Sequence, residues 1–269
     1  MKLSVVIPAR NESGNIEETA LALTRRLVRD RIPYEIIVVD DGSSDDTPDV
    51  VLRMAAEHHL RLVRNPVPHG FGRAVAKGLD SVEGDAVVIV MADGSDDPDD
   101  VVKYYYVLRD QADCAFGSRF MRGGFAQDYP RFKLVLNRLG NALIRWIFRI
   151  PYNDITNAFK GYRTYVIQGC RPLLSPHFNL TVEIPLKAIV RGYSYAVVPI
   201  GWRNRKAGVS SFRIQEMGSR YLYIILVVWL ERLLTRNDYR RGSDETFVPW
   251  EQWQRRGVSP AQDQRAGTT

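Results

Sequence analysis

A dense group of carboxylates follows an apolar run in the first half of the chain. The segment VVIVMADGSDDPDD, residues 87–100, carries five aspartates behind its apolar residues. Carboxylate oxygens are preferred ligands of a hard cation such as Mg²⁺ or Mn²⁺, which commonly shares its other positions with substrate phosphates and water. We therefore expect Asp93, with Ser95 nearby, to be a metal ligand. Asp99 and Asp100 instead suit the first turn of a helix, where they complement its dipole.

Three further polar segments lie at the ends of apolar runs. PARNE (8–12) and DDGSSDDT (40–47) each follow such a run, and NPVPHGFGRA (65–74) is rich in glycine and proline. The runs alternate with segments of helical periodicity, which predicts an α/β fold with a mostly parallel sheet and helices on both faces. Ligands bind beyond the carboxyl ends of such strands, so the polar segments should meet at one edge. The predicted strands are 3–9, 35–41, 60–65 and 86–93, and the predicted helices are 15–30, 47–59 and 72–82.

The second half of the chain is less regular but contains two long helical patterns. In residues 131–150, four arginines fall on one stripe beside an apolar sector. This pattern fits either an interfacial helix over anionic headgroups or a core helix with a solvated basic edge. Residues 213–234 are apolar almost all round at their centre, so protein, a partner chain or lipid must cover them. Residues 195–202 predict another strand, and from about residue 236 the polar composition predicts a mobile tail.

The composition is that of an ordinary globular protein. The 269 residues are 45% hydrophobic and 25% charged, which allows a sizeable core. The net charge of +6 arises from arginine-rich segments and suggests an anionic partner, such as a phosphate or a membrane. These segments lack the interleaved aromatic residues typical of nucleic-acid binding, so we expect no such partner. Two cysteines, no visible signal peptide and no apolar run near the roughly 20 residues of a membrane span favour a cytoplasmic location.

Six segments resemble, in order, the motifs of family 2 glycosyltransferases with the GT-A fold. The match covers roughly residues 3–215, and the segments are SVVIPARNESGNI, EIIVVDDGSSDDT, GFGRAVAKG, VIVMADGSDDPDD, FGSRF and NRKAGVSSF. The likeness is strongest to the dolichol-phosphate mannosyltransferase-like branch, the polyprenyl-phosphate glycosyltransferases. The resemblance implies a Rossmann-like GT-A catalytic domain over 1–215. An apolar helix over 213–235, at an interface or a membrane, and a polar tail over 236–269 would follow it.

The resemblance also implies a reaction. A sugar would pass with inversion from a nucleotide-diphosphate sugar, such as GDP-mannose or a UDP-sugar, to a polyprenyl phosphate (dolichyl or undecaprenyl), assisted by Mg²⁺ or Mn²⁺. A lipid phosphate is already an anion and needs no general base, whereas a soluble glycan or another hydroxylated acceptor would need one. The protein would contact the inner face of the cytoplasmic membrane peripherally, or bury its apolar helix in a homo-oligomer.

One position departs from the family pattern. The metal motif of the family is Asp-x-Asp, and Met91 stands at its first position, with Asp93 at the second. Methionine is a poor ligand for a hard cation. A nucleotide-sugar-binding protein without activity is therefore an alternative to an active enzyme.

Residues at the strand ends form the expected donor site. By the resemblance, Pro8, Ala9 and Arg10 would form the wall of the slot for the base. Glu12 would reach the ribose hydroxyls, although a glutamate also suits the first turn of a helix. Six further residues are assigned to the donor site: Asp40, Asp41, Lys77, Ala92, Arg122 and Ser210. Asp40 and Asp41 could equally form a tight turn, and Lys77 could be a solvated helix lysine.

Arginines are expected at the phosphate groups, because a guanidinium group binds phosphate bidentately and stays charged. The resemblance assigns this role to Arg119 in GSRF and to Arg205 in NRKAGVSSF, which would otherwise be surface charges. Asp154, in NDITNAFKGYR, would orient the acceptor or an arginine, or else cap a helix. Glu183 would orient groups on the acceptor side. With Asp93, these four complete the candidate catalytic residues.

Overall fold

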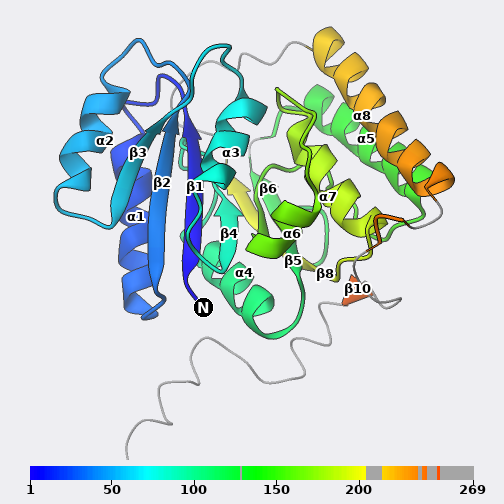
Figure 1. The fold of residues 1–269 in the computed structure, drawn as a ribbon, viewed down its shortest axis with the longest axis horizontal. Helices are drawn as coiled ribbons and strands as arrows, with labels where there is room; N and C mark the ends of the chain where they lie inside the picture. Colours follow the sequence, from blue (N-terminus) through cyan, green and yellow to red (C-terminus); the bar gives the residue numbers. More distant parts are fainter. Residues whose placement is uncertain (128, 204–213, 236–237, 241–246, 249–269) are drawn as a thin grey trace, which may run out of the picture.

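A single twisted sheet forms the centre of the molecule (Figure 1). The computed structural model describes residues 1–127, 129–203, 214–235, 238–240 and 247–248. Within these residues, eight strands pair in the order β10-β8-β5-β7-β4-β1-β2-β3, and all pairs run parallel except the two that β7 makes. These strands are β1 (Leu3–Ala9), β2 (Tyr34–Asp40), β3 (Leu60–Arg64), β4 (Ala86–Ile89), β5 (Cys114–Ser118), β7 (Lys160–Arg163), β8 (Tyr195–Pro199) and β10 (Phe247–Val248).

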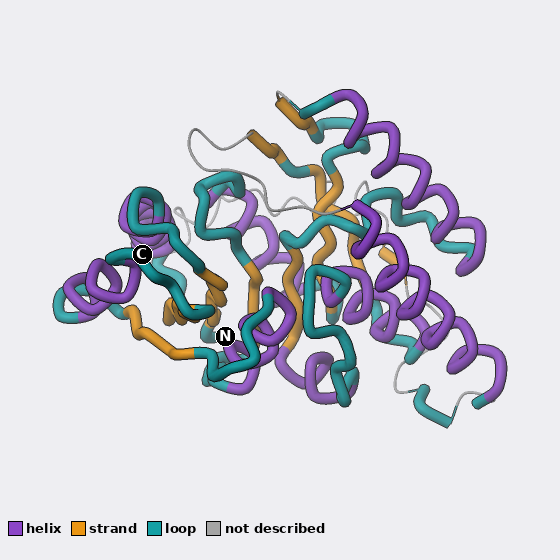
Figure 2. The backbone as a smooth tube through the Cα atoms, turned by 90° about the horizontal axis from the view of Figure 1, so that it is seen from above, coloured by secondary structure: helices purple, strands orange, loops and turns teal. Residues whose placement is uncertain are grey.

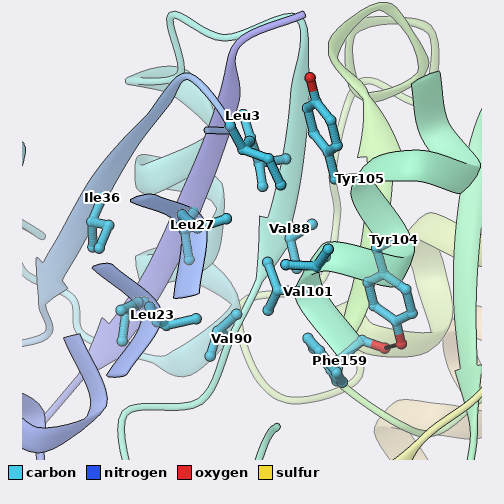
Figure 3. Close-up of a cluster of buried hydrophobic side chains, with 14 of the residues drawn as sticks. Leu3, Leu23, Leu27, Ile36, Val88, Val90, Val101, Tyr104, Tyr105 and Phe159 are labelled. Carbon is cyan, nitrogen blue, oxygen red and sulfur yellow. Dashed lines mark hydrogen bonds between the residues drawn. The ribbon is translucent and has the colours of Figure 1, made fainter. Parts of the chain in front are cut away.

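Helices bury both faces of the sheet. On one face, Leu3, Val5 and Ile7 of β1 belong to an apolar cluster with α1, α2 and α4, part of which Figure 3 shows. On the other face, Val6 belongs to a second cluster with α3 and α5 to α8. Strands buried on both sides need no polar face, which is why they appear in the sequence as continuous apolar runs. The predicted α/β fold is therefore confirmed. The helices are α1 (Ile16–Arg29), α2 (Thr47–Ala55), α3 (Phe71–Asp80), α4 (Pro98–Asp110), α5 (Arg131–Phe148), α6 (Thr164–Gly169), α7 (Leu180–Val190) and α8 (Ile214–Leu234).

A small second sheet continues from the carboxyl ends of β5 and β8. It consists of β6 (Phe125–Gln127) and β9 (Gly201–Arg203), which pair in parallel. Backbone hydrogen bonds from Ile200 N to Ser118 O (3.1 Å) and from Phe125 N to Ile200 O (3.1 Å) join it to the end of the large sheet. The chain segments that follow β5 and β8 are thereby held together on the ligand side of the fold.

Helices α5 and α8 lie side by side at one end of the molecule (Figures 1 and 2). Arg232 Nη1 of α8 donates a hydrogen bond of 2.6 Å to the Phe148 carbonyl at the end of α5. Since Phe148 is in the last turn of α5, this bond satisfies a carbonyl that the helix leaves without an intrahelical partner. Among the described residues, no helix has the length and hydropathy of a membrane span.

The described part of the C-terminal segment contains one short strand. Within residues 236–269, which the sequence predicts to be a mobile tail, β10 pairs in parallel with Tyr195 and Ala196 of β8. Strand β8 would otherwise be the edge of the sheet, and β10 extends it by one short strand. Residues 236–237, 241–246 and 249–269 lie outside the described part of the chain.

Candidate active site

A large cavity opens at the carboxyl ends of β1, β2, β4 and β5, the edge where the sequence predicts ligand binding. Its volume is about 1020 Å³. Polar side chains from the strand ends line one part of it, and apolar side chains from α5 and α8 line another. Among the predicted site residues, those that line the cavity are Pro8, Ala9, Arg10, Glu12, Asp41, Asp93, Ser95 and Arg119.

The two aspartates that end β2 have different surroundings. Asp41 lines the cavity, and its Oδ1 accepts hydrogen bonds from Asn65 Nδ2 (2.7 Å) and Gly70 N (3.0 Å). These bonds tie β2 to the glycine-rich loop that leads into α3. Asp40 lies outside the cavity lining, and its Oδ1 accepts from Ser43 N (2.9 Å) to close the turn. Asp41 is therefore placed to contact a ligand, and Asp40 shapes the loop beside it.

His69, in the polar segment 65–74, lines the cavity although the sequence analysis does not single it out. Its ring lies against Gly42, where a Cβ atom would come within 2.4 Å of Nε2, and Gly42 has φ +74°. Only a residue without a side chain provides this room in this backbone conformation. His69 Nδ1 is 3.5 Å from Asp41 Oδ1. The imidazole and the Asp41 carboxylate thus face the same end of the cavity.

The loop between β4 and α4, residues 90–97, which we call the carboxylate loop, brings two aspartates to the cavity. Asp93 Oδ1 accepts from Ser95 N (3.1 Å) across Gly94, which has φ +70°. Asp96 also lines the cavity, and its Oδ2 accepts from Met91 N (2.9 Å). Burial raises the pKa of Asp96 to about 7, and the neighbouring Asp93 charge contributes to the rise. The sequence analysis does not select Asp96, although Asp96 belongs to the same acidic segment as Asp93 and follows it by only three residues.

The donor atoms of this loop suit a hard cation. Asp93, Ser95 and Asp96 offer carboxylate and hydroxyl oxygens to one cavity, whereas Met91 offers a thioether. The described residues contain no group of three or more His, Cys, Asp and Glu side chains arranged to hold a metal ion. A cation here would therefore take its remaining ligands from substrate phosphate and water, as Mg²⁺ commonly does. The residues fit such an ion.

Arg119 is fixed by a buried carboxylate. Asp154 Oδ2 accepts from Arg119 N (3.0 Å) and Nε (2.8 Å), while Oδ1 accepts from Nη2 (2.7 Å). Burial opposes the guanidinium charge, but the hydrogen bonds that Arg119 donates to Asp154 and the charge of that carboxylate outweigh it and raise the pKa of Arg119. Arg119 lines the cavity and Asp154 lies behind it. The guanidinium thus stays charged at the end of β5, and the Asp154 carboxylate balances its charge.

Glu183 lies away from the cavity. Its carboxylate accepts hydrogen bonds from Leu174 N (2.7 Å), Ser175 N (2.7 Å) and Lys187 Nζ (2.6 Å). These bonds hold the loop that precedes α7, and that loop contributes His177 to the cavity wall. Glu183 thus supports the wall from behind.

The remaining predicted residues are not brought into the cavity lining. Ala92 is buried, and its carbonyl accepts from Thr19 Oγ1 (3.0 Å). Lys77 lies on α3 and Arg122 is exposed after β5; neither lines the cavity. Arg205 and Ser210 lie outside the described residues, so their predicted roles stay predictions.

The apolar part of the cavity lies between α5 and α8. Leu136, Leu143 and Ile144 of α5 line it from one side, and Leu222 and Ile225 of α8 line it from the other. The two helices also carry an exposed apolar surface, which we call the α5–α8 surface. Its members include Phe132, Val135, Leu139 and Trp146 of α5, and Tyr223, Leu226, Leu230, Leu233 and Leu234 of α8.

Two aromatic residues in the cavity wall were also missed. Trp202 of β9 and Tyr129 both line the cavity near Asp96 and Arg119. Trp202 ends the predicted strand 195–202, which was the available signal. Tyr129 is brought into the cavity by tertiary packing, and its neighbours in the sequence give no sign of this.

Comparison with known proteins agrees with this geometry. Residues 4–176 match the family described as "Glycosyl transferase family 2". A dolichol-phosphate mannosyltransferase from Pyrococcus furiosus is 29% identical over 79% of this chain and 60% of its own length. A polyprenol monophosphomannose synthase from Mycolicibacterium smegmatis is 30% identical over 80% of this chain and 86% of its own length. The chain thus spans less than two thirds of the first of these relatives.

Solved structures share the fold at lower identity. Glucosyl-3-phosphoglycerate synthase from Mycobacterium tuberculosis, in complex with Mn²⁺, uridine diphosphate and glucosyl-3-phosphoglycerate, superposes with a TM-score of 0.64 at 21% identity. The superposition covers 86% of this chain and 79% of that one. The predicted family is confirmed by the sequence match, which covers more than half of the chain: the protein belongs to glycosyl transferase family 2.

Proposed function

We propose that the protein transfers a sugar, with inversion, from a nucleotide-diphosphate sugar to a polyprenyl phosphate, either dolichyl or undecaprenyl. GDP-mannose and UDP-sugars are the donors to test. The observation that carries the proposal is one cavity that joins a polar end, at Asp41, Asp93 and Arg119, to an apolar groove between α5 and α8. A charged donor and a lipid acceptor need these two environments side by side. The names of the two relatives support the same acceptor class.

The order of the strands suggests how the donor lies. Along the ligand edge, β2 supplies Asp41, β1 supplies Pro8 to Arg10, β4 leads to Asp93, and β5 leads to Arg119. The base would lie between Asp41 and the end of β1, with Glu12 near the ribose. The diphosphate would then reach Asp93. The sugar would point toward Arg119, beyond which the apolar groove begins.

A divalent cation fits the middle of this path. Asp93, Ser95 and Asp96 would hold Mg²⁺ or Mn²⁺, which when bound would neutralise charge on the departing diphosphate. Crystals of the structural neighbour contain Mn²⁺ together with uridine diphosphate, which supports a divalent metal. Met91 supplies no oxygen, so Asp93 is the first carboxylate to test.

The surroundings of the buried acids favour a phosphate acceptor over a hydroxyl acceptor. A hydroxyl acceptor would need a general base, and Asp154 and Glu183, the acids assigned to the acceptor side, would be the first residues to consider. Asp154 is bound to Arg119, and Glu183 is bound to Lys187 and two backbone amides, both away from the cavity lining. A phosphate acceptor needs only positioning and positive charge, which Arg119 supplies. Arg205 and Ser210 remain proposed contributors to this charge and positioning.

The α5–α8 surface would bring the protein to its lipid. The apolar side chains named above are exposed on the two helices, and Arg131, Arg138 and Arg145 follow one stripe of α5, whereas Arg149 lies just after its last residue. A helix with an apolar face and a basic edge binds at the headgroup level of an anionic membrane. We therefore propose peripheral attachment to the inner face of the cytoplasmic membrane. Burial of this surface in a homo-oligomer is the alternative that the attachment test separates.

The experiment incubates the purified protein with labelled GDP-mannose, UDP-glucose and related donors, and with undecaprenyl or dolichyl phosphate in detergent. The proposal expects label to enter the organic phase with one donor, and Asp93→Asn to lower kcat/KM by about 100-fold or more. Asp97→Asn is the matched control, because Asp97 caps α4 through Asp99 N (2.9 Å) outside the cavity lining. Its kcat/KM should stay within about twofold of wild type.

Two results would overturn the proposal in different ways. Label that enters only water-soluble products, with glycans or small hydroxylated compounds as acceptors, would replace the lipid acceptor by a soluble one. Tight donor binding without turnover for any acceptor would identify the inactive nucleotide-sugar-binding protein that Met91 raises as an alternative.

A further inference from the structure

Trp202 and Tyr129 form an aromatic pair in the wall of the cavity. Their ring centroids are 5.1 Å apart and the rings are inclined at 56°. The Arg119 guanidinium lies 5.4 Å from the centroid of the Tyr129 ring. All three side chains line the cavity. The pair is therefore adjacent to the positive charge at the end of β5.

Backbone contacts hold Trp202 against the carboxylate loop. Trp202 forms an antiparallel bridge with Asp96, and Arg203 N donates to Ser95 O (3.4 Å). On the other side, Gly201 N donates to Asp100 Oδ2 (2.9 Å). Asp100 was expected only to complement the dipole of α4, and it also anchors β9. The backbone of Trp202 is thus held beside the residues proposed to meet the diphosphate.

The aromatic pair lies partway along the proposed donor path. Asp93 and Asp96 precede it and Arg119 follows it, so it lies between the diphosphate and the acceptor charge. In a nucleotide-diphosphate sugar, the group between these two points is the sugar ring. A pyranose has an apolar C–H face and hydroxyl groups at its rim. An aromatic ring packs against such a face, and the indole N–H and phenol O–H can bond to the rim.

We propose that Trp202, together with Tyr129, is the positioning platform for the sugar ring of the donor. This inference rests on the proposed function and adds to it the residues that hold the transferred group. Trp202 would contribute to the binding of the sugar and to the orientation of its anomeric carbon toward Arg119. It would contribute nothing to the binding of the nucleotide diphosphate alone.

Calorimetry on Trp202→Ala and Trp202→Phe tests this, with GDP against GDP-mannose and UDP against UDP-glucose as probes. In Trp202→Ala, Kd for the nucleotide diphosphate should stay within about twofold of wild type, while the sugar donor should bind about 10-fold more weakly. Its kcat/KM should fall by about 30-fold or more. Trp202→Phe keeps an aromatic face and should recover most of the loss.

Phe125→Ala is the control for an indirect effect, in which Trp202→Ala acts by disturbing the small sheet of β6 and β9. Phe125 packs against Gly201 from outside, and it does not line the cavity. The Phe125→Ala variant should leave the ratio of Kd for the sugar donor to Kd for the nucleotide diphosphate unchanged. The inference is overturned if Trp202→Ala weakens both ligands equally, if Phe125→Ala has the same effect, or if only the KM for the lipid acceptor changes. Wild type that binds none of the four probes would instead contradict the proposed function.

Discussion

The geometry of Arg119 depends on a single carboxylate. Asp154 accepts three hydrogen bonds from Arg119, two from the guanidinium and one from the backbone. A lysine at position 119 could keep the charge but not the two-point contact. Arg119→Lys should therefore lower kcat/KM for transfer to the lipid phosphate by about 100-fold, with a smaller effect on donor binding measured by calorimetry.

A second buried arginine in the same protein provides the matched control. Arg191 pairs with Glu231 through Nε–Oε1 (2.7 Å) and Nη2–Oε2 (2.9 Å), away from the cavity lining. Arg191→Lys should lower the unfolding temperature yet leave kcat/KM within about twofold of wild type. Equal kinetic losses in the two lysine variants would mean that Arg119 acts only through stability.

Lys160 predicts a specific dependence of stability on pH. It is fully buried on β7, and Nζ lies within hydrogen-bonding distance of the carbonyls of Ile155 (2.9 Å), Asn157 and Thr181 (3.2 Å). Burial lowers the pKa of Lys160 from 10.5 to about 7. Between these values the unfolded chain binds more protons than the folded one, so the contribution of Lys160 to stability increases as the pH rises.

The comparison of wild type with Lys160→Met isolates this effect, because the other groups titrate alike in both proteins. From pH 7 to pH 9, the free energy of unfolding of wild type relative to the variant should increase by about 2 kcal/mol. Urea unfolding at the two pH values measures it. A difference that stays constant or decreases with pH would show that Lys160 is charged in the folded protein throughout this range.

At the scale of elements, α5 and α8 have two tasks. Their inner side chains line the cavity, and their outer side chains form the α5–α8 surface. Asn137 and Asn141 of α5 also bond to Thr156 Oγ1 (2.8 and 3.1 Å), two residues after Asp154. The helix proposed to meet the membrane is thus joined to the loop that fixes Arg119.

Flotation with anionic vesicles tests the proposed attachment. Trp146 is 77% exposed and Leu139 is 63% exposed on α5. Replacing both with Glu removes apolar contact and adds charge that the headgroups repel, so vesicle binding should fall by about tenfold or more. Leu52→Glu is the control, since Leu52 is 50% exposed on α2 and distant in the fold.

The same variants also distinguish membrane attachment from burial of the α5–α8 surface against a partner chain. If the surface is buried in a homo-oligomer, wild type should remain with the aqueous fraction and the Trp146→Glu, Leu139→Glu variant should shift to a smaller species in ultracentrifugation. That pattern would contradict membrane attachment through α5 and α8.

At the scale of the whole molecule, the sequence predicts best the strands that are buried along their whole length. β1, β2 and β4 are recognisable because strands buried on both faces are apolar along their length. β7 was not predicted, because its four residues, KGYR, lack an apolar run, and its place between β4 and β5 is set by long-range pairing. The family motifs likewise located the strand ends that meet at the cavity.

Sequence reasoning failed where a role depends on contacts between distant residues. The Arg119–Asp154 pair joins residues 35 positions apart, so the choice between an acceptor ligand and an arginine partner for Asp154 needed coordinates. Glu183 matched a family acid, yet its backbone partners place it behind the cavity wall. The polar segment 65–74 was predicted at the ligand edge of the sheet, but not the part that His69 plays in it, and Tyr129 enters the cavity through loop packing that no local pattern encodes.

The central claim is that the lipid occupies the groove between α5 and α8 with its phosphate next to Arg119. A polyprenyl phosphate that carries a photoreactive group on its chain, crosslinked and mapped by mass spectrometry, tests this directly. The account predicts labels on the cavity-lining residues of α5 and α8, such as Leu143 and Ile225, and their loss when unlabelled polyprenyl phosphate competes. Labels confined to other elements, or labels that unlabelled lipid phosphate does not displace, would contradict it.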